Sequence, residues 1–164
     1  PYNIIAMKRR ILFFLVAMFL VSGISKTMAQ TADLRGIWQM CFYVSGDPSI
    51  PGELKPSNSF KILTDDGKFI NMTMIPNKGA IIIGSGTYKQ TAPNAFTEHV
   101  EKNLHLPQLV GVDNVLEYEM KGGEVMIVKF FVKKDVDGNE INSWYYETWK
   151  KVKMPATYPK DLVR

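Results

Sequence analysis

Residues 114–152 read NVLEYEMKGGEVMIVKFFVKKDVDGNEINSWYYETWKKV, and this stretch decides the fold class. Three short blocks in it are rich in Val, Ile, Phe, Tyr and Trp, the residue types that favour strands. Between the blocks lie Gly122-Gly123 and Asp137-Gly138-Asn139, which supply the positive φ angles that tight hairpin turns need. The stretch therefore predicts three consecutive antiparallel strands joined by hairpins.

The same pattern extends towards the N-terminus as far as Leu34, with no convincing helix between the blocks. A meander of eight strands leaves two unpaired edges unless the sheet closes. We therefore expect an all-β protein, an eight-stranded antiparallel up-and-down barrel, with a two-sheet sandwich as the alternative. Gly84-Ser85-Gly86 inside the fourth strand indicates a sharp bend. The expected strands are Leu34 to Val44, Ser59 to Thr64, Lys68 to Ile75, Ala80 to Gln90, Ala95 to Glu101, Asn114 to Lys121, Glu124 to Lys134 and Glu140 to Val152.

The first 29 residues have the layout of a secretory signal peptide. The basic run Lys8-Arg9-Arg10 follows Met7, an apolar run extends from Ile11 to Val21, and small residues precede a cleavage site after Ala29. Because a membrane-spanning helix needs ~20 apolar residues, an uncleaved anchor is the weaker alternative. We expect residues 1–6 to be a spurious leader before Met7, and residues 30–164 to form a single domain that is periplasmic or secreted.

Charge and cysteine content exclude several classes of function. Four of the 20 Lys and Arg residues lie in residues 1–29, which hold no acid, so residues 30–164 carry 16 basic and 16 acidic side chains. A neutral domain without a basic stripe predicts no nucleic-acid partner. One Cys and two His exclude a disulfide scaffold and a Cys-rich zinc site, and we predict no metal and no cofactor.

His99 and Glu101, which share one face of a strand, form with the later His105 the candidate cluster for metal binding or acid-base chemistry. No third firm metal ligand, activated nucleophile or orienting group accompanies them. The sequence therefore favours a protein that is not an enzyme. An enzyme that uses Glu98, Glu147 or His99 stays open as a further hypothesis.

The connections between strands sort into two ends, because alternate links of a meander lie at the same end of a barrel. Two long loops, Ser45 to Asn58 and Lys102 to Asp113, lie at one end with the turns near Asn77 and Gly138. The other end has only tight links, at 65–67, 91–94 and 122–123. The sequence thus predicts a cup with a closed floor and a looped mouth, a recurrent place for ligand sites.

Period-two alternation assigns side chains to the barrel interior. On the first strand it turns Trp38, Met40 and Phe42 inward. A two-residue turn at Asp66-Gly67 would pair Ile62 with Asn71 and Phe60 with Thr73, and turn all four inward. The sequence leaves open whether this interior holds a ligand or is filled by its own side chains. The predicted ligand-binding residues are Met40, Phe42, Phe60, Ile62, Asn71, Glu98, Tyr118, Phe130 and Glu147.

Two carboxylates are expected inside the barrel, because Glu98 shares a face with Phe96 and Glu147 shares one with Trp149. A buried carboxylate is costly unless it is paired. In the functional interpretation, one or both bind a hydroxyl or amine of a ligand. In the structural interpretation, they pair with Lys151, Arg35 or a Tyr hydroxyl.

Gly36-Ile37-Trp38 forms a G-x-W motif at the start of the first expected strand. In an eight-stranded chain with a signal peptide, this resembles the lipocalin and calycin group. The resemblance implies that Trp38 plugs the closed end of the barrel and is covered by a basic side chain from the last strand. That side chain would be Lys150 or Lys151, and we choose Lys151.

A closer resemblance covers residues 33–153 and is to the secreted bacterial lipocalin-like domains of unknown function. It implies the fold and export, and it brings no characterised ligand or catalytic residue. The segments that carry it are Leu34-Arg35-Gly36-Ile37-Trp38-Gln39, Asp66-Gly67-Lys68-Phe69, Gly86-Thr87-Tyr88, Phe96-Thr97-Glu98 and Glu147-Thr148-Trp149-Lys150.

Two functions are compatible with these features. The first is an exported lipocalin-like protein that binds a small, largely apolar ligand in the barrel, entering between the two long loops. The second is a filled barrel whose mouth loops bind an envelope protein or a glycan. The sequence leaves the ligand and the oligomeric state open. The apolar loop anchors of the second function would be Ile50, Leu54, Leu104, Leu106 and Leu109.

Overall fold

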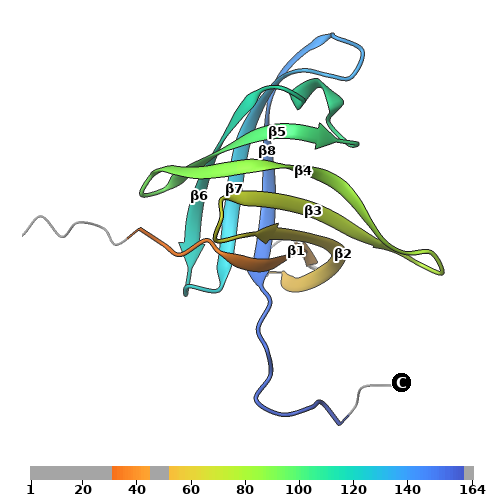
Figure 1. Ribbon diagram of the computed structural model, residues 1–164, viewed down its shortest axis with the longest axis vertical. Helices are drawn as coiled ribbons and strands as arrows, with labels where there is room; N and C mark the ends of the chain where they lie inside the picture. Colours follow the sequence, from red (N-terminus) through yellow and green to blue (C-terminus); the bar gives the residue numbers. More distant parts are fainter. Residues whose placement is uncertain (1–30, 45–51, 161–164) are drawn as a thin grey trace, which may run out of the picture. The chain divides into compact units, whose positions relative to one another are not determined.

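The computed structural model describes residues 31–44 and 52–160. In this part eight antiparallel strands follow one another as neighbours and close into a barrel, with β1 paired to β8 (Figure 1). The predicted all-β closed barrel is therefore confirmed. The elements are β1 (Gly36–Val44), β2 (Glu53–Leu63), β3 (Lys68–Ile75), β4 (Gly79–Ala92), β5 (Ala95–Asn103), the 3-10 helix η1 (Pro107–Leu109), β6 (Asp113–Lys121), β7 (Val125–Lys134) and β8 (Glu140–Lys151).

Some predictions fall outside the described residues. They are the signal peptide over 1–29, the leader before Met7, the cleavage after Ala29 and the loop anchor Ile50. In residues 31–44 and 52–160, no helix is long and apolar enough to cross a membrane.

Residues at positive φ form the turns where the sequence predicts them. Gly67 (φ +78°) closes the β2–β3 turn, Gly122 and Gly123 (+58° and +71°) the β6–β7 turn, and Gly138 (+87°) the β7–β8 turn. Most side chains are strained at these angles, whereas glycine is not. The tight β2–β3, β4–β5 and β6–β7 links share one end of the barrel, as the sequence predicts for the floor, whereas residues 45–51 of the predicted mouth lie outside the described residues.

The β2–β3 register differs from the prediction by one residue. Asn71 pairs with Lys61, where the sequence predicts Ile62. The turn has three residues instead of two, because the Thr64 amide donates to the Lys68 carbonyl at 2.9 Å and the Lys68 amide donates to the Thr64 hydroxyl at 2.9 Å. The predicted pairing was wrong, and a lysine takes the interior position.

Two further expectations fail where β1 meets β2. β2 begins at Glu53, so the predicted loop over 45–58 is wrong in its second half. The register also shifts between Gln39 and Cys41, which interrupts the alternation along β1. Phe42 is 57% exposed, which corrects its predicted interior position, while Cys41 is buried and burial raises the pKa of its thiol. Cys41 thus behaves as a small apolar side chain.

The glycines of β4 allow a close approach between strands. β4 is continuous through Gly84-Ser85-Gly86, where the sequence predicts a bend. In place of the bend, the register shifts between Asn71 and Met72 in the pairing with β3, and between Ser85 and Gly86 in the pairing with β5. A Cβ on Gly86 would lie 2.0 Å from the His99 carbonyl oxygen and 2.8 Å from the Phe69 ring. Only glycine therefore fits at this position.

Trp38 seals the floor, as the resemblance implies. It is fully buried, and its indole Nε1 donates to the Leu34 carbonyl at 2.8 Å. The Lys151 ammonium lies 5.2 Å from the centre of the Trp38 ring and donates to the Asp33 carbonyl. Gly36 has φ +123°, and a Cβ there would lie 3.3 Å from Lys151 Cε, so the glycine leaves room for the covering lysine.

Candidate functional site

The barrel interior is filled towards the floor and hollow towards the mouth. The filled part contains large side chains with less than 2% exposure, among them Trp38, Phe69, Phe96, Leu63, Leu116, Met126, Val100 and Val128. The hollow part is a cavity of about 340 Å³. The floor half of the interior is thus filled by its own side chains, while the mouth half contains a cavity. The cavity is lined by Met40, Ser59, Phe60, Asn71, Ile83, Asn103, His105, Leu106, Phe130, Tyr145, Glu147 and Trp149.

An ion pair lies buried between β2 and β5. The Lys61 ammonium is 2.5 Å from Glu98 Oε1, and the two side chains are only 3% and 6% exposed. The Lys61 Nζ also lies 5.6 Å, 5.9 Å and 5.5 Å from the ring centres of Phe69, Phe96 and Trp149. Aromatic faces attract a desolvated cation, so this lysine is held by one carboxylate and three rings. The partners that the sequence predicts for Glu98 are wrong, since Lys61 takes that role.

Glu147 is the ionisable acid that lines the cavity. Trp149 Nε1 donates to Glu147 Oε2 at 3.0 Å. Burial raises the pKa of Glu147 above its ordinary value, the positive charge of Lys61 and the Trp149 hydrogen bond oppose this rise, and the charge of Glu98 adds to it. The side chain therefore takes up a proton more readily than a glutamate in water, within reach of any ligand in the cavity.

Replacing Glu147 with Gln should remove a pH dependence of stability. Because the folded pKa of Glu147 lies above 4.5, its ordinary value, its contribution is complete below that pH and is lost as the pH rises through the folded pKa. The wild type should therefore lose stability relative to Glu147→Gln over that window. Lys61, Glu98 and His105, the charged or titratable groups around the site, are present in both proteins.

Urea denaturation of both proteins from about pH 4 to pH 8 measures this difference in the free energy of unfolding. A difference in unfolding free energy that does not change with pH would contradict a raised pKa of Glu147 in the folded protein.

The structure brings five of the nine predicted ligand-binding residues to the cavity: Met40, Phe60, Asn71, Phe130 and Glu147. Tyr118 instead lies towards the floor, where its hydroxyl donates to the Pro93 carbonyl at 2.7 Å. Glu98 is sequestered by Lys61, and neither Ile62 nor Phe42 is a lining residue. Ile83 was missed because it is the extra residue of the β4 bulge opposite Asn71 and Met72, which alternation does not reveal.

The connection between β5 and β6 forms the rim of the cavity. Asn103 Oδ1 accepts hydrogen bonds from the backbone amides of His105 and Leu106 at 3.0 Å and 2.8 Å. Leu106 packs against the core and Leu109 is only 9% exposed, whereas Leu104 is 69% exposed. Leu54 lies half-buried within β2. The expectation of a set of exposed leucine anchors is therefore wrong for Leu54, Leu106 and Leu109.

His99 lies on the outer face, as the sequence predicts. Its Nδ1 is 2.7 Å from Asp113 Oδ1, and both side chains are more than half exposed. In the described ranges, no group of three or more His, Cys, Asp and Glu side chains is arranged to hold a metal ion.

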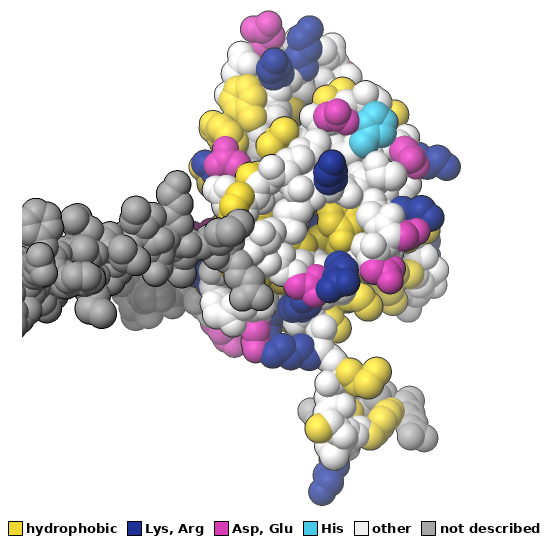
Figure 2. Space-filling model, turned by 60° about the vertical axis from the view of Figure 1, so that its left-hand side comes forward, with side chains coloured by type: hydrophobic (Ala, Val, Ile, Leu, Met, Phe, Trp, Pro, Cys, Tyr) yellow, Lys and Arg dark blue, Asp and Glu magenta, His cyan; other side chains and the backbone are white. Residues whose placement is uncertain are grey.

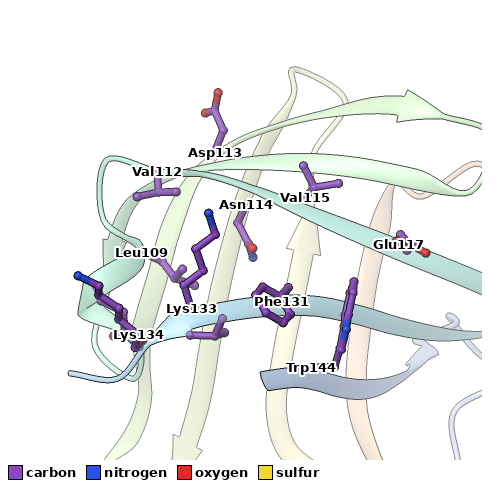
Figure 3. Close-up of a pocket in the computed structure, with 12 residues that line it drawn as sticks. Leu109, Val112, Asp113, Asn114, Val115, Glu117, Phe131, Lys133, Lys134 and Trp144 are labelled. Carbon is purple, nitrogen blue, oxygen red and sulfur yellow. The ribbon is translucent and has the colours of Figure 1, made fainter. Parts of the chain in front are cut away.

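A second hollow of about 500 Å³ lies on the outer face, where β6 and β7 separate (Figure 3). Their pairing runs only from Leu116–Phe130 to Lys121–Val125. Val115, Phe131 and Trp144 line this outer groove, with Lys133 and Lys134 at one end (Figure 3). Two of its acids are already paired, Glu117 with Lys129 at 2.9 Å and Asp113 with His99. The interior cavity, which holds an unpaired acid, is therefore the stronger candidate site.

Surface charges of both signs are interspersed on the face seen in Figure 2. Several charged side chains of the described residues form exposed pairs within one strand or hairpin, such as Lys68 with Asp66 and Lys121 with Glu119. No field of a single sign covers this face, and exposed pairs of this kind contribute little to stability.

The chain is similar to one family over most of its length. Residues 33–160 match the model of a domain of unknown function, DUF4488. Comparison with the curated proteins finds no match. The matched range spans all eight strands, the floor with Trp38 and every residue that lines the interior cavity. The chain belongs to the DUF4488 family, whose barrel here has the calycin-like arrangement of a plugged floor and an open mouth.

Proposed function

We propose that this protein is an exported carrier or sensor that binds one small, largely apolar molecule in the cavity at the mouth of its barrel. The walls of the cavity are mainly apolar and aromatic, which favours binding of an apolar body by removing it from water. A few polar groups, among them Asn71 and Glu147, stand among these walls and would orient the ligand. The proposal of export rests on the signal-like residues 1–29.

One observation supports ligand binding above the others. Asn71 Oδ1 is buried, lines the cavity and has no hydrogen-bond partner among the described residues. Leaving a buried acceptor unsatisfied costs about 1–3 kcal/mol. A donor group on a ligand in the cavity would satisfy this acceptor.

The volume limits the size of the ligand. A cavity of about 340 Å³ lies at the lower end of the range for small-molecule sites. At the packing density of protein interiors, it accommodates a molecule of roughly 200–300 Da.

Replacing Ile83 with Trp should abolish binding, because the larger side chain fills part of the cavity. Ile82→Trp is the matched control, since Ile82 is the preceding residue of β4 and is 61% exposed. We would purify the full chain and both variants from the native host and measure the bound mass by native mass spectrometry. The wild type and Ile82→Trp should carry an adduct of roughly 200–300 Da that Ile83→Trp lacks.

Leu106→Trp fills the cavity from the rim and serves as a second variant if Ile83→Trp does not fold. Circular dichroism checks the fold of each protein. A wild type with no adduct, or an adduct that survives in both filling variants, would contradict the proposed function.

A further inference from the structure

Three ionisable side chains meet near the base of the cavity. Lys61 contacts Glu98 directly, and Glu147 is close enough for its pKa to respond to the charges of both. Trp149 joins the group, because its ring lies 5.5 Å from the Lys61 ammonium and its Nε1 donates to Glu147. Lys61 and Glu98 are buried and Glu147 is half-buried, so with both acids ionised this cluster carries one uncompensated negative charge that is partly removed from water.

An uncompensated charge in such a region is costly. Other cations among the described residues do not remove it. Lys151 lies over Trp38 at the floor, and Lys150 is exposed. His105 lines the cavity, but its side chain is exposed at the rim, where solvent screens a charge. Because burial raises the pKa of Glu147, binding a proton on Glu147 is the way in which these side chains can reduce the charge without a ligand.

The walls beside Glu147 suit an organic cation. Phe130 and Tyr145 stack at 5.7 Å between ring centres, and Phe60 and Trp149 also line the cavity. Aromatic faces attract ammonium groups, while their area favours an apolar body. These rings and the unpaired acid thus present the features that recognise an alkyl or aryl ammonium ion.

We propose that the ligand is an amine with an apolar body, whose ammonium group binds Glu147 and supplies the positive charge that the cluster lacks. This inference rests on the proposed function and specifies its ligand class. The ammonium takes the place of the proton on Glu147, so no bond within the ligand is made or broken. An amide or hydroxyl of the same ligand would donate to Asn71 Oδ1 in the same cavity.

Three probes of one shape test the ligand class: phenethylamine, phenethyl alcohol and 3-phenylpropionate, which are cationic, neutral and anionic near pH 8. Titration calorimetry on the full chain should show the amine binding about tenfold or more tighter than either analogue. Affinity for the amine should increase with pH as Glu147 ionises, with Lys61, Glu98, His105 and Tyr145 as the neighbouring charged or titratable groups.

Glu147→Gln should remove the preference for the amine, so that phenethylamine and phenethyl alcohol bind with similar affinity. Glu140→Gln is the matched control, because it removes an exposed acid from the same strand and should leave the preference unchanged.

The outcomes separate this inference from the proposed function. Equal or tighter binding of the alcohol or the phenylpropionate, blocked by Ile83→Trp, would overturn the amine class and leave the cavity function standing. Binding of none of the probes would also overturn the amine class, and together with a bare protein in native mass spectrometry it would overturn the cavity function.

Discussion

Replacing Lys61 with Met should lower the free energy of unfolding by about 3–5 kcal/mol. The substitution keeps most of the side-chain volume but leaves Glu98, which is 4% exposed, without the ammonium that it contacts. The variant must then bury an uncompensated carboxylate or protonate it, and both cost free energy. Urea denaturation at neutral pH measures the change.

The double variant Lys61→Met/Glu98→Leu provides the control. Replacing both members of a buried ion pair by apolar residues of similar volume is often nearly neutral, so the double variant should regain most of the lost stability. A Lys61→Met protein within about 1 kcal/mol of the wild type, or a double variant less stable than the single one, would show that the pair does not carry the energetic role described here.

Replacing Gly86 with Ala should destabilise the protein by about 3 kcal/mol, although it adds a single methyl group. The new Cβ would lie 2.0 Å from the His99 carbonyl oxygen and 3.1 Å from the Glu101 amide nitrogen, both of them backbone atoms of β5. A side chain could rotate away, but a paired strand must move as a whole. Thermal and urea unfolding of the variant would show the loss.

Gly84→Ala, two residues earlier in the same strand, is the matched comparison. Its Cβ would meet Asn71 Nδ2 and the Lys102 carbonyl at 3.3 Å, which needs shifts of only a few tenths of an ångström. We expect it to cost less than about 1.5 kcal/mol. Equal effects at the two positions would mean that loss of glycine flexibility, and not the contact with β5, sets the cost.

Much of the architecture could be predicted because its signals are local. Turn glycines such as Gly67 and Gly138 mark where strands end, and short runs of β-branched and aromatic residues mark the strands themselves. The strand count then predicts closure, and turn lengths alone distinguish mouth from floor. The position of Trp38 and its cover by Lys151 followed from the resemblance to calycins.

The identity of the side chains that point into the barrel was harder to predict, because it depends on the exact register between neighbouring strands. One additional residue in the Asp65–Gly67 turn places Lys61 in the interior instead of Ile62, and a sequence pattern gives no reason to put a lysine in a core. The bulges near Cys41 and Ile83 likewise exchange inner and outer faces. The ion pair with Glu98 joins residues 37 positions apart and is visible only once both strands are in place.

The outer groove had no counterpart in the sequence analysis. It exists because β6 and β7 stop pairing beyond Leu116 and Phe130, although both strands continue. Alternation predicts which face a side chain occupies, but it does not predict where two neighbouring strands separate. Gln108, whose Oε1 is buried without a partner in the described chain, lines this groove.

The location of ligand binding is the central claim, and methyl NMR tests it most directly. We would label the methyl groups of Met, Ile, Leu and Val in the full chain and titrate the phenethyl probe that binds most tightly. We expect the largest shifts at Met40, Ile83 and Leu106, which line the interior cavity. Largest shifts at Val112 and Val115 would place the ligand in the outer groove and contradict the account.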